Sequence, residues 1–96
     1  MSRSLIERRL TAVNDRLKRA RAELVVIDEQ LAALAEAADE TRVRALVSET
    51  PLADREHDEA QRHADAMARS RAAVLSTISE LERSQDELLD RLVARS

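Results

Sequence analysis

Apolar residues recur at alternating spacings of four and three along both halves of this 96-residue chain. That spacing forms the seam of a coiled coil, where one stripe of a helix packs against a neighbouring helix. One run covers 6–38 and the other covers 53–92, and the two are mirror images, so that Ile6 matches Leu92 and Leu17 matches Leu81. The sequence therefore predicts an all-α fold, an antiparallel two-helix coiled-coil hairpin.

The composition excludes most other folds. The chain has no Gly, no Cys and no aromatic residue, and it has one Pro. Without Gly there is little material for tight turns or phosphate-binding loops, and without aromatic side chains a thick globular core is hard to fill. We expect one helical unit over 1–96, with helices over 4–47 and 51–95 joined by a tip at 48–50.

Capping residues support these boundaries. Thr50 precedes Pro51, and a Thr cap before a Pro in the first helical position is a common way to begin a helix. Ser4 and Glu7 have the spacing of a capping box, which predicts the start of the first helix.

A pair of helices this thin leaves apolar residues without cover, because a small chain buries little of its surface. Several apolar residues fall outside the seam, and we predict that they bury against a second copy, giving a homodimeric antiparallel four-helix bundle, or against a partner. These self-association residues are Leu5, Val25, Val26, Leu75, Leu89 and Val93.

The tip carries a second set of off-seam apolar residues, surrounded by acids. In one interpretation they form an apolar knob with an acidic rim that docks into a protein partner. In the other, the helix breaks near Asp39 and residues 40–48 fold back over their own apolar face. The residues concerned are Val43, Leu46, Val47 and Leu52, with Glu49, Asp54 and Glu56.

The N-terminal part of the chain is basic and offers contacts to phosphate. The hairpin also places it beside residues 77–90, which are rich in acids, so charge pairing between the helices is the favoured interpretation. A net charge of −3 and the lack of aromatic residues for base stacking argue against a general nucleic-acid binder. The basic residues are Arg8, Arg9, Arg16, Lys18, Arg19 and Arg21.

Three polar residues occupy seam positions in the second run. The mirror register places Gln85 opposite Val13, Arg71 opposite Ile27 and His57 opposite Thr41. A single polar seam residue commonly specifies register, which is our interpretation of Gln85. Arg71 is expected to extend its head group to solvent.

No residue pattern indicates catalysis, a metal site or a cofactor. His57 and His63 are six positions apart and do not share a helix face. Neither a membrane-spanning run nor a signal-peptide core is recognisable, so we expect a cytoplasmic protein with no small-molecule substrate. The sequence favours a non-enzymatic adaptor or regulatory protein-interaction module that uses its tip. The alternatives are a nucleic-acid-associated protein using residues 8–21, or a purely structural spacer.

Overall fold

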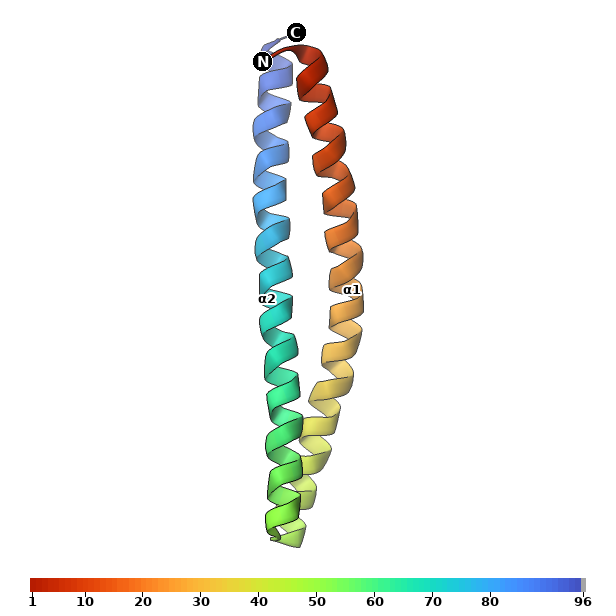
Figure 1. The fold of residues 1–96 in the computed structure, drawn as a ribbon, viewed down its shortest axis with the longest axis vertical. Helices are drawn as coiled ribbons and strands as arrows, with labels where there is room; N and C mark the ends of the chain where they lie inside the picture. Colours follow the sequence, from red (N-terminus) through yellow and green to blue (C-terminus); the bar gives the residue numbers. More distant parts are fainter. Residues whose placement is uncertain (96) are drawn as a thin grey trace. The chain divides into compact units, whose positions relative to one another are not determined.

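The structure is a computed structural model that describes residues 1–95, and these residues form two long helices with no strand. Helix α1 spans Arg3–Ser48 and helix α2 spans Pro51–Ala94 (Figure 1). The predicted all-α class with two long helices is confirmed. The predicted unit over 1–96 also includes Ser96, which lies outside the described residues.

The start of α1 differs from the sequence prediction. The Ser2 hydroxyl, not that of Ser4, accepts a hydrogen bond from the Leu5 backbone N–H at 3.2 Å. The Glu7 carboxylate accepts from Arg3 Nε at 3.0 Å instead of reaching back to the cap. The predicted Ser4–Glu7 capping box is therefore wrong, because Ser2 caps the helix and Glu7 serves an ion pair one turn along it.

The start of α2 follows the prediction. The Thr50 hydroxyl oxygen accepts a hydrogen bond from the Ala53 backbone N–H at 3.2 Å. Pro51 is the first helical residue, where its missing N–H leaves no backbone acceptor unsatisfied.

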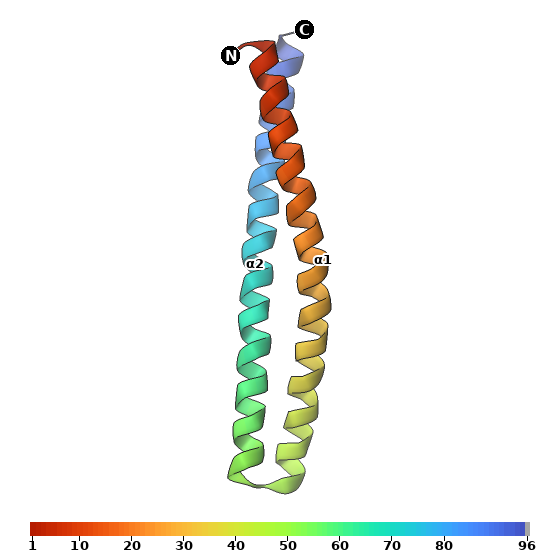
Figure 2. The same ribbon diagram turned by 45° about the vertical axis from the view of Figure 1, so that its right-hand side comes forward.

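Contacts within the chain form two compact units, which we describe separately. Unit 1 combines Met1–Leu24 with Ala73–Ser96, and unit 2 is Val25–Ala72. Both helices contribute to each unit, as the two views of the ribbon show (Figure 2).

Unit 1 contains the larger apolar side chains. One cluster joins Leu17 and Ala20 of α1 to Ile78 and Leu81 of α2, with Val13, Leu24 and Val74 packed against it. A second joins Ile6 and Leu10 to Leu88, with Val13 and Leu92 alongside. Ile6 and Leu17 are each only 1% exposed, the deepest large side chains. The order of these contacts is antiparallel, as the mirrored seam predicts.

Unit 2 is built on smaller residues. Its buried positions are Ile27, Ala38, Ala53 and Ala64, while the larger seam residues, such as Leu31, Leu34 and Met67, remain half-buried. Small residues allow two helices to approach closely but remove little apolar surface from water. Burial in both units nevertheless follows the seam, since every residue of the two 4–3 runs is buried or half-buried.

The polar seam residues find partners beside the seam. In unit 1, Gln85 Nε2 donates to Asn14 Oδ1 at 2.7 Å, next to the predicted Val13. In unit 2, Arg71 Nε donates to Asp28 Oδ1 at 2.6 Å, next to the predicted Ile27. Each bond links the two helices at one register, so a shift of either helix would break it. The Arg71 head group, expected to extend to solvent, pairs with Asp28 instead, and the Arg71 side chain is 40% exposed.

The difference between the units can be tested by truncating one leucine in each. Leu17→Ala should lower the free energy of unfolding by about 2–5 kcal/mol, because it leaves a cavity at a fully buried site. Leu34→Ala should cost less than half as much, because that side chain is already partly hydrated. Urea unfolding followed by circular dichroism measures both. The exposed Val47→Ala is the control and should stay within about 0.5 kcal/mol; equal losses at Leu17 and Leu34 would contradict this account.

Candidate protein-binding site at the turn

Helix α1 continues without a break up to the turn. Residues 40–48 belong to the same helix as the residues before them, ending at Ser48. Local bonds support this course: the Thr41 hydroxyl lies 2.9 Å from the carbonyls of Ala37 and Ala38, and Arg42 pairs with Asp39 at 3.0 Å. The alternative in which 40–48 folds back is therefore wrong, because no Gly or Pro interrupts the helix there.

The continuous helix leaves the apolar side chains of the turn in solvent. We call four of them the tip residues: Val43, Leu46, Val47 and Leu52 are 49%, 67%, 81% and 63% exposed. Val43 and Val47 line a shallow surface hollow of about 460 Å³, together with Asp39, Glu40 and Arg44. Large apolar side chains grouped in this way are common at binding surfaces.

Acidic side chains surround the tip residues. Residues 39–59 contain seven acids and three bases. Two of the bases are engaged locally, since Arg42 pairs with Asp39 and Arg44 pairs with Glu56 at 3.6 Å. Glu49 and Asp54, predicted as part of the rim, are exposed and form no ion pair among the described residues. The region therefore presents an uncompensated negative charge around an apolar centre.

The backbone of the turn is strained at one residue. Glu49 has a φ of 52°, the left-handed conformation that usually follows the last residue of a helix and is usually taken by Gly. Its N–H donates to the Ala45 carbonyl at 3.1 Å, which closes the last turn of α1. A glutamate at this position costs about 1 kcal/mol in backbone strain and puts a carboxylate at the turn itself.

A side-chain contact joins the two helices close to the tip. Thr41 Oγ1 lies 3.4 Å from His57 Nδ1, as the mirror register predicted for this pair. The Thr41 hydroxyl has one hydrogen, and the two nearby α1 carbonyls accept it, so the contact requires His57 to donate from Nδ1. His57 is thus a half-buried spacer between the helices.

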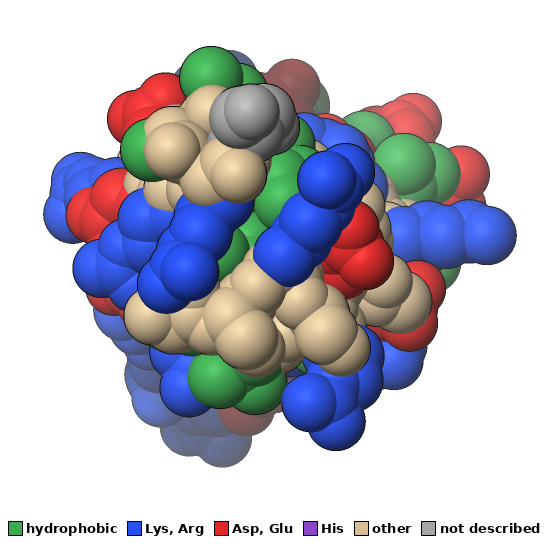
Figure 3. All heavy atoms as spheres, turned by 90° about the horizontal axis from the view of Figure 1, so that it is seen from above, with side chains coloured by type: hydrophobic (Ala, Val, Ile, Leu, Met, Phe, Trp, Pro, Cys, Tyr) green, Lys and Arg blue, Asp and Glu red, His purple; other side chains and the backbone are tan. Residues whose placement is uncertain are grey.

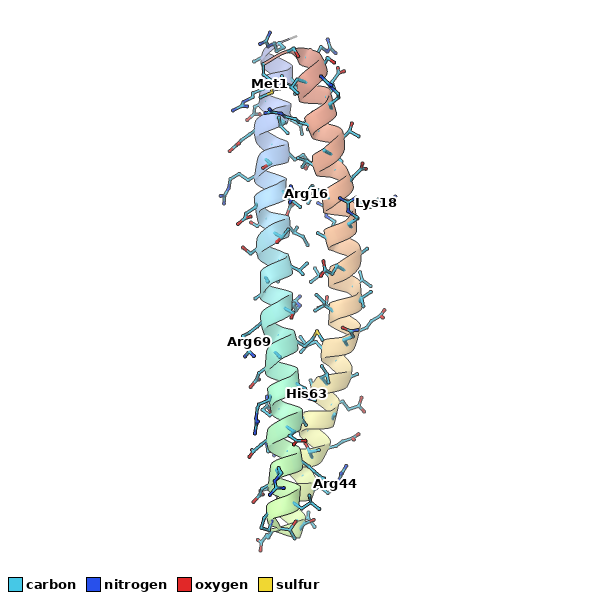
Figure 4. All side chains as sticks on the ribbon, viewed as in Figure 1. Met1, Arg16, Lys18, Arg44, His63 and Arg69 are labelled. Atoms are coloured by element: carbon cyan, nitrogen blue, oxygen red, sulfur yellow. The ribbon has the colours of Figure 1, made fainter. Side chains whose placement is uncertain are left out.

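The basic segment of α1 is mostly unpaired. Arg21 pairs with Glu82 at 3.9 Å, and both side chains are about half exposed. Arg8, Arg9, Arg16, Lys18 and Arg19 form no ion pair with any described residue. The predicted charge pairing with residues 77–90 is therefore wrong for all but one of the six basic residues. Lys18 points away from α2, which keeps it out of reach of those acids (Figure 4).

Two of these arginines border a groove between the helices of unit 1. Figure 4 shows Arg16 between α1 and α2. The groove has a volume of about 330 Å³ and an apolar floor, with three guanidinium groups around it. We call it the basic groove; it is lined by Arg9, Ala12, Val13, Arg16, Ser84, Glu87, Leu88 and Arg91. Arg91 was not predicted as a site residue from the sequence, although the mirrored register places position 91 close to position 9.

Basic and apolar side chains also meet where the two termini lie. Seen from that end, basic groups border a strip of apolar side chains (Figure 3). A smaller hollow there, of about 230 Å³, is formed by Met1, Ile6 and Ala94 with Arg91 and Arg95. The positive character of unit 1 therefore continues past the basic groove.

Five of the six predicted self-association residues are exposed in the single chain. Val93 is the most exposed, at 73%, and Leu75 the least, at 38%; Leu89, Val25 and Val26 fall between them. The sixth, Leu5, is half-buried within unit 1.

Other site types are not found in the described part of the chain. Over residues 1–95, no three metal-binding side chains converge, and neither helix has a stretch long and apolar enough to cross a bilayer. No protein-family model, curated protein or solved structure matches this chain.

The strain at Glu49 can be measured through a Gly substitution. Glu49→Gly should raise the free energy of unfolding by up to about 1 kcal/mol, because Gly adopts a positive φ without a steric cost. Glu59→Gly, at an exposed position inside α2, should lower it by about 1 kcal/mol because there Gly only weakens a helix. Urea unfolding of both variants checks the sign; a loss at Glu49 as large as that at Glu59 would contradict the left-handed conformation.

Proposed function

We propose that this chain is a non-enzymatic interaction module, an adaptor or regulatory protein that recognises a protein partner through its tip. The observation that carries the proposal is the unbroken course of α1 to Ser48, which leaves four large apolar side chains in solvent at the turn. These side chains are not needed for the fold of the chain itself, because none belongs to the seam.

The tip has the composition of a binding surface with an apolar centre. Burying one such side chain is worth about 1.5–3 kcal/mol, so three or four together provide most of the free energy of a specific contact. The acids around them favour a partner whose apolar pocket has a basic rim. Glu49 strengthens this argument, since backbone strain outside the packed core is most often kept where it serves function.

The remaining parts of the proposal concern where and how the module acts. We propose that it works in the cytoplasm, without a cofactor and without a small-molecule substrate. We also propose that it self-associates through its exposed off-seam residues, giving a four-helix bundle, because two helices that bury mainly alanine in unit 2 gain stability from further burial. A purely structural spacer would need no exposed apolar tip.

Nucleic-acid binding is the second candidate function. The observation that favours it is the set of five basic side chains in residues 8–19 without ion pairs. Glu87 inside the basic groove and the absence of aromatic residues weaken it, because a carboxylate repels phosphate and bases have nothing to stack on.

The tip proposal is tested with a double substitution. Leu46→Asp with Val47→Asp should abolish capture of the partner from native lysate while changing the melting temperature little, since both residues are exposed. The matched control is Ala72→Asp with Ala73→Asp, an adjacent exposed pair on α2 outside both the tip and the self-association residues, which should retain capture. Quantitative mass spectrometry of the captured proteins gives the measurement. The proposal fails if both double variants capture the same proteins as the native chain.

Nucleic-acid binding is tested by its dependence on salt. Affinity for duplex DNA that rests on the basic segment should fall by about tenfold or more between low and physiological salt, because each phosphate contact releases a counterion. Fluorescence anisotropy of a labelled duplex measures it, with Arg8→Ala/Arg9→Ala as the weakened variant. Docking through the apolar tip should weaken much less steeply with salt, so capture repeated at the same two salt concentrations separates the two functions.

A further inference from the structure

The basic groove of unit 1 is a surface whose charges have no partner within the chain. Arg9, Arg16 and Arg91 surround an apolar floor that includes Val13 and Leu88. None of the three forms an ion pair with a described residue. Glu87 is the single acid that lines the groove, so three positive charges face one negative charge.

The α1 side of the groove has a definite spacing. Arg9 and Arg16 are seven residues apart, so their Cα atoms are separated by about 10.5 Å along the helix axis. Ala12 and Val13 lie between them at the third and fourth positions. A ligand that matches this surface therefore carries two negative charges about 10 Å apart, with a small apolar surface between them.

The same chain contains a segment that matches this description. Glu29 and Glu36 of α1 are also seven residues apart, with Ala32 and Ala33 at the third and fourth positions between them. We call these four residues the acidic segment. All four are exposed, and neither glutamate forms an ion pair with a described residue.

The position of the acidic segment on the helix keeps it accessible. The seam residues around it, Leu31 and Leu34, are half-buried against α2. At 100° per residue, Glu29 and Glu36 fall on the face of α1 opposite that seam. Val25, 58% exposed, extends the same face by one turn and adds apolar surface.

The charges of the two units are complementary on a larger scale as well. Unit 1 contains ten basic and eight acidic residues, whereas unit 2 contains six basic and eleven acidic residues. Contact between unit 1 of one copy and unit 2 of another therefore joins opposite net charges, and contact between like units joins equal ones.

We propose that the basic groove binds the acidic segment of a second copy of this chain. Glu29 and Glu36 of that copy pair with Arg9 and Arg16, and the two alanines between the glutamates pack on the apolar floor. Alanine permits the helix backbone to come close to the groove, which a larger side chain would prevent. Arg91, on the opposite wall, adds a third positive charge.

The groove contact rests on the proposed self-association, whose orientation it fixes, and does not depend on recognition of a foreign partner by the tip. The acidic segment contains none of the tip residues, so tip recognition can be absent while the groove contact is present, or the reverse. Tip recognition is measured by capture from lysate, and the groove contact by the mass of the purified protein.

The experiment is a charge exchange on the full chain. One variant carries Arg9→Glu and Arg16→Glu, and the other carries Glu29→Arg and Glu36→Arg. Sedimentation equilibrium at low salt should show self-association of the native chain and a loss of about tenfold or more in affinity for each variant alone, because like charges then face each other. An equimolar mixture should recover association, since every groove in the mixed complex again faces a segment of opposite charge.

Arg62→Glu with Arg69→Glu is the matched control. These two arginines are also seven residues apart and exposed, and Arg69 points away from α1 (Figure 4). This variant has the same change in net charge as the Arg9→Glu/Arg16→Glu variant. It should nevertheless associate as the native chain does. Circular dichroism establishes that each variant keeps its helix content, as expected for substitutions at exposed positions.

Three results would overturn the proposal. The proposal is wrong if the native chain stays monomeric at high micromolar concentration in low salt. It is also wrong if the groove and control variants lose association equally, or if the mixture does not recover association. If the chain alone stays monomeric and its binding of duplex DNA requires Arg9 and Arg16, the groove is a phosphate site. The proposal is then likewise wrong.

Discussion

Packing along one apolar seam holds this chain in its fold. The seam is repeated in reverse order, so a leucine or isoleucine early in α1 meets its counterpart late in α2. Ile6 and Leu17 are almost completely buried as a result. All other features depend on this pairing. It brings Gln85 to Asn14 and Arg71 to Asp28, and it forces everything that is not on the seam to face water or a partner.

That last consequence explains why the proposed binding surfaces lie where they do. A two-helix protein has no interior in which to build a pocket, so its recognition elements are exposed side chains in fixed helical positions. At the turn these are apolar with an acidic surround, and in unit 1 they are basic around a small apolar floor. Helical spacing sets the distances between the backbone positions that carry these side chains.

Much of this could be read from the sequence, because coiled-coil packing depends on spacing alone. The two helices and the contact of His57 with Thr41 follow from the 4–3 pattern and its reflection, and the Thr50 cap follows from the Thr-Pro pair. The course of residues 40–48 could not be predicted from the sequence. Apolar residues outside the seam are compatible both with a helix that folds back over them and with a continuous helix that leaves them exposed. The structure selects the second, because Thr41 and Arg42 bond within the helix they belong to.

Charge pairing was the weakest part of the sequence reasoning. Acids and bases on facing helices suggested ion pairs, yet pairing also requires that side chains emerge on adjoining edges of the two helices. Arg9 and Arg16 emerge in a groove with Ser84, Glu87 and Arg91 but pair with no acid, and of the six basic residues in 8–21 only Arg21 forms an ion pair with an acid of 77–90. Residues 77–90 are rich in acids, but most of these acids lie on faces of α2 that do not adjoin the basic residues of α1. Heptad position, more than local composition, decides such contacts.

The distribution of large and small seam residues affects how the chain can be made in the cell. Contacts between large apolar side chains join Ile6 and Leu10 to Leu88, residues far apart in the sequence. Contacts close in sequence, around Ala45 and Ala53, bury little and close only a short loop. During synthesis the ribosome releases residues 1–24 long before residues 73–95 exist, so that half of unit 1 emerges with its leucines uncovered. A nascent chain of this kind keeps those side chains exposed to solvent until residues 73–95 have been made and can pack against them.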